Sequence, residues 1–529
     1  MGGSQESRGQ NAVVPLLLGM LGPRAITAPE AKQITRVVTE TIGQLRAAYP
    51  HSDVITATSV AAGTDTEAAQ AAHDIDCPVY ALLPLEVDDY AQDFGEGELP
   101  LADRLDLTEG HWVSPGVAGS SRDARYQACG RMLARLSTTM LVAWNGQDPE
   151  KPGGTADTLH FAVPEVAALE DLSGGPSALT SERGDILVFP PDGSEELARI
   201  GPRLSRHPWQ AGSDSVSQRI EEFNRDAGDA THDRGAILAI QEAADALASS
   251  LQARYRRWTT FLLFLGVLAL VSVDVQAEIA RAWFLGAQAL TVITVLGMWW
   301  GLNRWAGKRK FEEYRALAEG ARVQEAWQKA GVEACVADHY LQPMGEEGFW
   351  IRRALRTGWF LDLANRPAAI QDSNPVSARE WIEGQLRYFE GSNSKPGAIR
   401  RNSRKAKQMA WLAWVLAGLA LAGLAPGAAE VMTSGSVDSA FVAGGRLAWG
   451  LGSASAAAVV AYSQLMGYSR AAKRGRLSLE MYRQALIDFD SVGSSQQAQR
   501  RIVLELGQEA LRETGDWLVM NTSQSVRPV

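Results

Sequence analysis

The sequence predicts an α/β domain at the N-terminus, followed by an all-α membrane region with four transmembrane helices in two hairpins and with cytoplasmic helices. Three observations lead to this fold class. Short apolar runs alternate with amphipathic helical segments over the first third of the chain, four later stretches carry no charged residue, and basic residues gather at the ends of those stretches. At 529 residues, the chain is long enough for about two to four structural units.

The N-terminal part repeats a strand-like run, a glycine turn and a helical segment. The runs are 13–20, 54–59, 79–83 and 140–144, and the helical segments are 30–48, 67–73 and 130–137. This repetition is typical of an open parallel sheet with helices on both faces, which is a Rossmann-like architecture. Ligands of such sheets bind outside the carboxyl ends of the strands, where these glycine turns fall.

Candidate ligand-binding residues lie in or beside the turns. Gly22 permits a close backbone approach, and Arg24 offers a planar fork suited to a phosphate. Gly63 and Thr64 lead into a helix whose first amides attract an anion, and Asp65 either accepts from a ribose hydroxyl or caps that helix. The other candidates are Ser59, Pro84, Tyr90, Asp93, Asn145, Gly146, Gly153, Gly154 and Thr155. The alternative interpretation is a set of tight strand-to-helix connections that bind no ligand.

Charge, cysteine spacing and the first residues exclude some classes of partner, site and targeting segment. The net charge of −10 argues against a nucleic-acid partner, because no overall field favours phosphate backbones. The three cysteines have neither zinc-site nor disulfide-framework spacing, so we predict three buried thiols and no metal site. The first ten residues are polar and contain no apolar core of a signal peptide.

The four uncharged stretches, 258–273, 282–303, 408–429 and 447–469, are predicted to cross the bilayer. A helix needs roughly 20 apolar residues to span the hydrocarbon core, and basic flanks that reach the headgroups let a shorter one serve. Tryptophans near the ends of the stretches favour this interpretation, because indole rings prefer the interface. The alternative is four buried helices of a large soluble core.

Basic residues next to these stretches predict their orientation. They are Arg254, Arg256 and Arg257 before the first, Lys308, Arg309 and Lys310 after the second, Arg400, Arg401, Arg404, Lys405 and Lys407 before the third, and Arg470, Lys473, Arg474 and Arg476 after the fourth. By the positive-inside rule, both short loops face outward and both termini face the cytoplasm.

The predicted membrane region contains pairs of small residues and a short repeated sequence. Pairs of small residues four apart are Gly418 and Ala422, Gly450 and Ala454, and Gly452 and Ala456. This spacing favours close helix packing or a homo-oligomer. A Tyr-Arg pair follows each hairpin, at Tyr314-Arg315 and at Tyr482-Arg483, which suggests a tandem duplication. Chance similarity between ordinary helices is the alternative.

The predicted domain organisation has five parts. They are a nucleotide-binding-type domain at 1–165, a linker or extension at 166–232, a first membrane module at 233–370, a connecting helical segment at 371–407 and a second membrane module at 408–529. Within the linker, 186–190 is a strand-like run.

Over its first third, the chain resembles the SLOG superfamily of Rossmann-like nucleotide sensors. The segments that carry the resemblance are Gly22-Pro23-Arg24, Ser59 to Asp65, Leu82-Leu83-Pro84, Tyr90 to Phe94, Trp144-Asn145-Gly146 and Gly153-Gly154-Thr155. The chain departs from the family pattern at Pro23 and Ala62. It also lacks the longer glycine signature of the related phosphoribohydrolases, having only PGGTAD with Asp157. The resemblance implies a nucleotide or an NAD-derived molecule as ligand.

The hairpins with their cytoplasmic helices are similar to the SLATT effectors of bacterial conflict systems, through the EYRALAEG stretch and the helix at 505–517. This resemblance implies a pore-forming effector in the bacterial inner membrane that acts in antiphage defence or stress signalling. One alternative is a membrane-tethered phosphoribohydrolase or glycohydrolase with Asp65, Asp93 or Asp157 as its acid or base. A membrane scaffold is the second alternative.

Overall fold

The computed structural model of the protein describes residues 12–114, 120–146, 152–163, 184–200, 205–228, 234–279, 282–304, 307–344, 346–365, 375–392, 394–432 and 439–523. The chain divides into two compact units. The first unit comprises Met1–Leu247, Glu313–Ser377 and Val503–Val529, and the second comprises Ala248–Glu312 and Ala378–Ile502.

The first unit is built on one eight-stranded sheet in the order β4-β3-β2-β1-β5-β6-β7-β8. The strands are β1 (Leu16–Leu21), β2 (Val54–Thr58), β3 (Val79–Leu83), β4 (Gly110–Val113), β5 (Thr139–Ala143), β6 (Asp185–Phe189), β7 (Ala198–Ile200) and β8 (Arg206–Pro208). The strands from β4 to β6 along this order pair in parallel, and β7 and β8 add antiparallel pairs. The strand order reverses at β1, which has β2 on one side and β5 on the other. The predicted parallel α/β domain is therefore confirmed.

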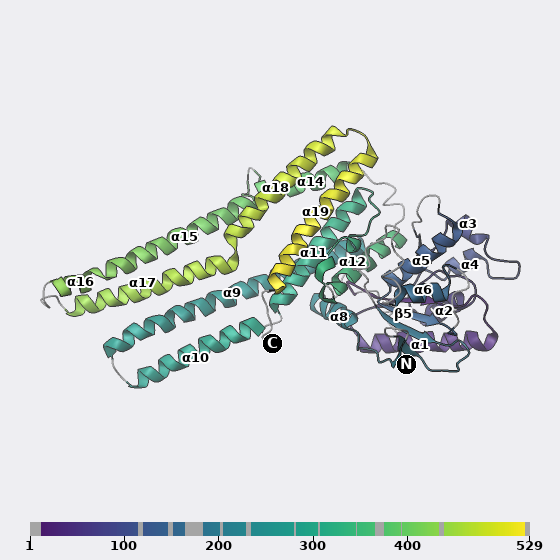
Figure 1. Ribbon diagram of the computed structural model, residues 1–529, viewed down its shortest axis with the longest axis horizontal. Coiled ribbons are helices and arrows are strands. Elements are labelled where there is room, and N and C mark those ends of the chain that lie inside the picture. The colour runs from purple at the N-terminus through teal and green to yellow at the C-terminus, as the bar shows by residue number, and fades with distance from the viewer. Residues whose placement is uncertain are drawn as a thin grey trace, which may run out of the picture. The chain divides into compact units, whose positions relative to one another are not determined.

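Helices cover both faces of this sheet. α1 (Ala28–Ala48) packs with α2 (Thr64–His73), and α5 (Arg122–Leu136) packs with α6 (Thr155–Ala162). Gly19 of β1 faces Leu133 of α5, whereas Gly22 faces Thr64 of α2. Because successive strand residues point to opposite faces, the two helix pairs lie on opposite sides of the sheet (Figure 1).

The region expected to be a linker contributes to the sheet domain. Its strand-like run forms β6, which pairs with β5, and it also supplies β7, β8 and α8 (Ser215–Ala227). Asp214 is the N-cap of α8, and its side chain accepts hydrogen bonds from the first-turn amides of Val216 and Ser217. The sheet thus extends beyond the predicted boundary at residue 165.

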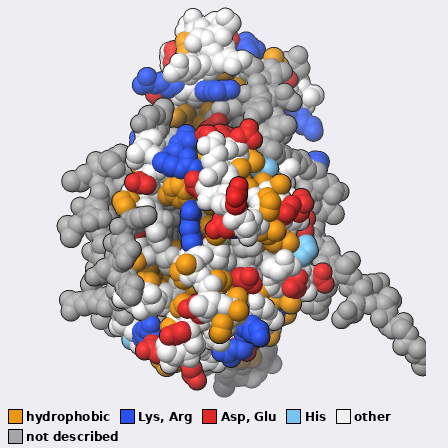
Figure 2. Space-filling view, turned by 90° about the vertical axis from the view of Figure 1, so that its right-hand side faces the viewer, with side chains coloured by type: hydrophobic (Ala, Val, Ile, Leu, Met, Phe, Trp, Pro, Cys, Tyr) orange, Lys and Arg blue, Asp and Glu red, His pale blue; other side chains and the backbone are white. Residues whose placement is uncertain are grey.

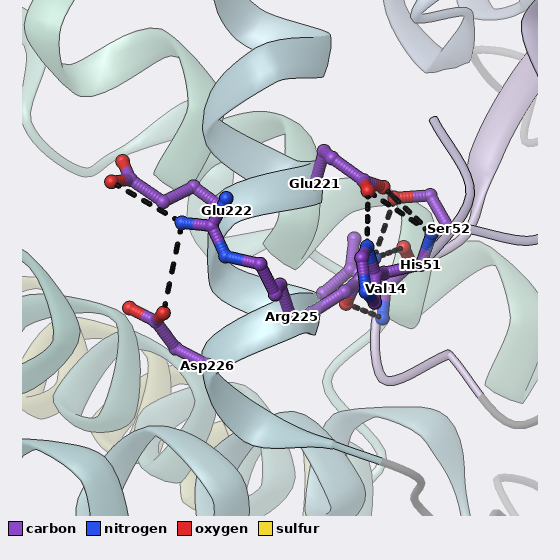
Figure 3. A network of polar contacts seen from close by, with 8 residues as sticks. Val14, His51, Ser52, Glu221, Glu222, Arg225 and Asp226 are labelled. Atoms are coloured by element: carbon purple, nitrogen blue, oxygen red, sulfur yellow. Dashed lines mark hydrogen bonds and ion pairs between the residues drawn. The ribbon is translucent and has the colours of Figure 1, made fainter. Parts of the chain in front are cut away.

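α8 is joined to the beginning of β1 and β2 by hydrogen bonds, of which those of Asn224 are buried (Figure 3). Asn224 accepts from the Val14 amide at 3.0 Å and donates to the Val14 carbonyl at 2.8 Å and to Ser52 Oγ at 2.9 Å. Glu221 accepts from the His51 amide at 3.0 Å and from Ser52 Oγ at 2.7 Å. These contacts hold α8 at the edge of the sheet opposite the glycine turns.

Helices from later in the sequence also belong to the first unit. α11 (Gly307–Lys329), from Glu313 onward, and α12 (Glu346–Asn365) meet α8 around three rings, those of Phe223, Tyr314 and Trp350. The Tyr314 hydroxyl donates to Asp226 at 2.9 Å. Part of α19 (Gln496–Ser523) packs on α11, where the Trp327 indole donates to the Val503 carbonyl at 3.2 Å.

The second unit consists of long helices. They are most of α9 (Ala236–Ile279), α10 (Ala282–Arg304), most of α14 (Pro375–Glu390), α15 (Ala398–Gly423), α16 (Ala425–Met432), α17 (Ser439–Met466) and α18 (Tyr468–Ser491). By length and composition, one helix among the described residues qualifies as a membrane span: Ala398–Met432, with a mean hydropathy of 1.8 over its most apolar window, of which 11% is buried. A helical C-terminal region with one such helix is what the structure supports.

Two helix breaks fall inside the predicted spans. The stretch 408–429 contains one turn residue, Leu424, which separates α15 from α16 within the helix Ala398–Met432 and stands two residues before Pro426. The stretch 447–469 passes the end of α17 at Gly467, which has a left-handed φ of 63°. Proline lacks an amide donor and glycine readily adopts a left-handed conformation, which accounts for both local interruptions.

The predicted small-residue pairs separate into two groups. α15 packs along α17, with Gly423 facing the Gly445 carbonyl and Gly452 facing Ala420. A Cβ built on Gly423 would lie 2.7 Å from the Gly445 oxygen, so only glycine permits this approach. Gly418 and Ala422 are exposed and take no part in this contact.

Candidate functional site

The carboxyl ends of β1 and β2 are brought together by glycines. Gly22 follows β1 and faces Thr64, and a Cβ built on Gly22 would lie 2.6 Å from that side chain. Gly63 precedes α2 with a φ of 78°, and a Cβ there would overlap the Arg24 carbonyl oxygen. The Thr64 amide and hydroxyl both donate to the Pro23 carbonyl, at 3.1 Å and 3.0 Å. The first amide of α2 therefore already donates a hydrogen bond to a carbonyl of the protein.

Asp65 lies beneath these turns and is almost completely buried. Its carboxylate accepts from Ser59 Oγ at 2.5 Å. Burial raises the pKa of the Asp65 carboxyl, and the hydrogen bonds from Ser59, Thr58 and the Ala61 and Gly22 amides act in the opposite direction. Asp65 therefore ties the ends of β1 and β2 together, and this internal role differs from the ribose contact that we considered from sequence.

Tyr90 extends the cluster from the end of β3. It belongs to α3 (Val87–Ala91), is fully buried, and donates its hydroxyl to the Ser59 carbonyl at 3.1 Å. Burial is the main cause that raises the pKa of the Tyr90 phenol. The predicted residues Ser59, Asp65 and Tyr90 thus meet in one hydrogen-bonded group at the carboxyl edge of the sheet.

Arg104 was not among the predicted site residues, although it forms hydrogen bonds with the connection between β2 and α2. It lies in α4 (Leu101–Leu105) and is 2% exposed. Its guanidinium donates to the Val60 carbonyl at 3.2 Å and to Thr66 Oγ1 at 2.6 Å, and it stacks 4.3 Å from the Phe94 ring centroid. Val60 has a φ of 50°, which is unfavourable for a β-branched residue, and Arg104 stabilises that turn.

Arg24 is the exposed cation of the site. It forms no ion pair with any described residue, and its guanidinium carbon lies 5.6 Å from the ring centroid of Tyr126 in α5. The Tyr126 ring also lies 6.2 Å from that of Tyr90. Among the described residues, the Tyr126 hydroxyl oxygen is buried and has no hydrogen-bond partner. At the reversal of the strand order, an exposed guanidinium therefore lies near a tyrosine ring whose buried hydroxyl has no partner among the described residues.

The turn before α6 reaches the same place. Gly153 has a φ of 78°, and a Cβ on it would lie 2.6 Å from Cβ of Tyr126. Asp157 accepts from the Gly153 amide at 2.8 Å and from Gln127 Nε2 at 3.1 Å. Gly154 is the N-cap of α6 and Thr155 its first residue. Lys151, which precedes this turn, lies outside the described residues.

The remaining predicted residues contribute less to this group, and Asp93 is attached to it through its amide, which donates to the Tyr90 carbonyl at 3.0 Å. Pro84 is buried at the end of β3, and Asn145 and Gly146 are exposed after β5. Asp93 pairs with Arg122, which also donates to the Asp89 carbonyl at 3.0 Å. Within the described part of the chain, no three His, Cys, Asp or Glu side chains are grouped so as to hold a metal ion.

The surface on the side of α3 and α4 carries both signs of charge. Figure 2 looks at this side of the molecule and shows basic and acidic side chains interspersed with apolar ones. Neither sign dominates this face, so an anion would be attracted by the local groups rather than by a broad field.

These features define the class of protein as one with a Rossmann-like parallel α/β domain followed by a mostly helical region that contains one possible membrane span. Comparisons with models of known protein families, with curated proteins and with solved structures found no match to this chain.

Proposed function

We propose that this protein is a membrane effector whose cytoplasmic Rossmann-like domain senses a nucleotide or an NAD-derived ligand and thereby gates or assembles a membrane pore. The observation that carries the proposal is the exposure of large apolar side chains along α9, α10, α15 and α17. Examples, one from each helix, are Phe264 at 63%, Leu290 at 66%, Trp414 at 79% and Val460 at 45% exposed.

Water is an unfavourable environment for so much apolar surface. Burying it gains about 25 cal/mol per Å², and soluble monomers rarely expose contiguous patches of this kind over several helices. Lipid removes the cost without a protein partner. The uncharged length of α10 and the flanking tryptophans support four spans in total, with both loops outside and both termini in the cytoplasm.

The sensing part of the proposal rests on the group around Arg24 and Tyr126. A guanidinium without a carboxylate partner suits a phosphate, and a free phenol hydroxyl beside it suits a ribose or base oxygen. Both lie where open parallel sheets bind their ligands. The resemblances to SLOG sensors and SLATT effectors add bacterial antiphage defence as the setting and a homo-oligomer as the assembly.

Ligand-dependent leakage tests this proposal. The full-length protein is reconstituted into dye-filled liposomes and exposed separately to AMP, ATP, NAD⁺ and ADP-ribose, each in excess. We expect one of them to increase dye release in the wild type and not in Arg24→Ala. Because hydrogen bonds to charged groups contribute about 1.5–3 kcal/mol, binding should weaken by roughly 10- to 100-fold.

Arg36→Ala is the matched control, because Arg36 is also exposed and, among the described residues, pairs only with groups of its own helix α1. It should leave ligand-dependent leakage unchanged. Leakage that ignores every one of these compounds, from protein that is inserted in the liposomes, would count against the sensing proposal.

The enzymatic alternative finds less support in the geometry. Asp65 is buried, Asp93 pairs with Arg122, and Asp157 holds the Gly153 amide. A general acid or base must reach the proton that it transfers, and each of these carboxylates is already engaged. Base release from nucleoside monophosphates by the full-length protein, abolished in Asp157→Asn, would instead favour the hydrolase.

A further inference from the structure

The helices at the base of the second hairpin carry a concentration of positive charge. The basic residues are Lys395, Arg400, Arg401, Arg404, Lys405 and Lys407 at the start of α15 and Arg470, Lys473, Arg474 and Arg476 at the start of α18. No acidic residue occurs in 391–407 or in 467–479. The charge of each segment is therefore not neutralised within the segment.

The two basic segments lie side by side within the second unit. α15 packs along α18, and a Cβ built on Gly475 would lie 3.1 Å from Ile399 Cγ1. At the other end of the contact, Lys405 Nζ lies 5.5 Å from the Tyr468 ring centroid. The segments therefore run antiparallel over the same length and form one surface.

Five of these residues define what we call the basic collar: Arg400, Arg404, Lys407, Lys473 and Arg476. All five are exposed, and none forms an ion pair with a described residue. Other arginines of the same unit are paired: Arg483 with Glu390, and Arg379 with Asp490 at 3.1 Å. The collar thus keeps its full charge for a partner outside the chain.

The collar lies next to the apolar part of α15. Trp411 and Trp414 follow it and are both exposed, as expected of indoles at an interface. Arg404 precedes Trp411 by seven residues, which is about 10 Å of helix at 1.5 Å per residue. The collar therefore stands on the side of Trp411 that faces away from the apolar part of α15, where the headgroups of a bilayer would lie.

We propose that the basic collar is a binding surface for the phosphodiester headgroups of anionic phospholipids. The inference rests on the proposed membrane insertion and adds a lipid requirement to it. Clusters of basic residues directly cytoplasmic to a membrane helix attract anionic lipids, and guanidinium groups bind phosphate through paired hydrogen bonds. The basic run after the first hairpin, at 308–310, is followed within three residues by Glu312 and Glu313, so the collar is a property of the second hairpin.

Lipid retention by the full-length protein tests the collar. The protein is purified from mixed micelles that contain equal amounts of phosphatidylglycerol and phosphatidylcholine, and mass spectrometry measures the ratio that it retains. We expect the wild type to be enriched in phosphatidylglycerol, and the enrichment to fall as NaCl is raised. Substituting all five collar residues by glutamine should lower the enrichment by on the order of tenfold.

Two further variants separate charge from fold. Exchange of each collar arginine for lysine, and of each lysine for arginine, keeps the charge and should keep the enrichment. Five exposed basic residues of the first unit, Lys32, Arg36, Arg206, Arg234 and Arg512, changed to glutamine provide the charge-matched control and should also keep it.

The outcomes distinguish this inference from the proposed function. If the wild type resists extraction by alkaline carbonate but retains both lipids equally, the proposed lipid binding by the collar is wrong. Membrane insertion is then still supported. Complete extraction by carbonate contradicts both. RNA that copurifies with the wild type, but not with the five-residue variant, would assign the collar to nucleic acid and overturn the lipid proposal.

Discussion

Single residues hold the backbone of the candidate site in an unusual shape. Gly63 combines a positive φ with a close approach to the turn after β1, where a built Cβ would overlap the Arg24 carbonyl, while Val60 nearby has a positive φ without being glycine. Such conformations cost about 1–3 kcal/mol each and persist only where neighbouring residues enforce them. Here Arg104 and Asp65 supply that enforcement through hydrogen bonds.

Gly63→Ala should destabilise the sheet domain by about 3 kcal/mol or more, because the new methyl group meets a backbone oxygen as well as an unfavourable φ. Gly97→Ala is the control. Gly97 has a φ of 93° and nothing within 4 Å, so the φ alone should cost about 1 kcal/mol. Thermal unfolding of the detergent-solubilised chain measures both, and equal midpoints would show that the close approach at Gly63 is unimportant.

Asp65 gives the stability a dependence on pH. Because burial raises its pKa in the folded state, its contribution is complete below the unfolded pKa of about 3.9 and is lost as the pH rises through the folded pKa. Asp65→Asn does not titrate. We therefore expect the thermal midpoint of Asp65→Asn to rise relative to wild type between about pH 4 and neutrality.

The exposed Asp103 provides the control for that comparison, since Asp103→Asn makes the same chemical change on the surface of α4. Its midpoint should follow the wild type across the range. A constant difference between Asp65→Asn and wild type at every pH would contradict the raised pKa.

The sequence identified some of the site residues and missed others for a clear reason. Arg24 and Gly63 stand in the connections that follow β1 and β2, and Asp65 stands in the first turn of the next helix, so their approximate location follows from the pattern. Tyr126 and Arg104 lie within helices, and only the packing of those helices brings them to the turns. No spacing in the sequence signals such an approach.

Among the elements, α8 connects parts of the chain that are distant in sequence. One side of α8 holds the beginning of β1 through Asn224, and another holds α11 through the hydrogen bond from Tyr314 to Asp226 and the ion pair between Arg219 and Glu313. Asn224 forms hydrogen bonds with both the amide and the carbonyl of Val14. It is therefore central to the attachment of α8 to the beginning of β1.

Asn224→Ala should cost about 2–4 kcal/mol, since it leaves two buried backbone groups of Val14 without partners. Arg225→Ala is the control within the same network (Figure 3). Arg225 is 53% exposed and lies 3.8 Å from Glu222, so its loss should cost less than about 1 kcal/mol. Similar midpoints for the two variants in thermal unfolding would refute this role of Asn224.

The strands that the sequence predicted are those with long apolar runs. β1, β2, β3, β5 and β6 are found within three residues of their predicted bounds, because each is buried and contains Leu, Ile or Val. β4 has the sequence Gly-His-Trp-Val and is only partly buried, and β7 and β8 have three residues each. Short edge strands of this composition have no periodic signal, so the sequence analysis missed them.

At the scale of the whole molecule, the first unit is assembled from three separate parts of the chain. α9, α11 and α19 each have residues in both units. The return of α19 to Trp327 depends on the fit of Gly507 against the indole ring. Contacts between segments so far apart in sequence cannot be recognised from periodicity, which is why the predicted domain boundaries followed the chain in order.

A ligand can shift such an assembly only by its difference in affinity between two states. Moving the population from about 1% to 99% requires roughly 10⁴-fold tighter binding to the favoured state. In the proposed sensor, the ligand would therefore have to make contacts that differ between the two states, and we propose Arg24 as the residue that makes them.

The central claim is that lipid surrounds the exposed apolar helices, and extraction of membranes tests it most directly. Membranes from cells that express the full-length chain are washed with alkaline carbonate and then with detergent. The account predicts that the protein stays in the membrane pellet through the carbonate wash and is released only by detergent. Full-length protein that is dispersed in buffer without detergent would contradict it.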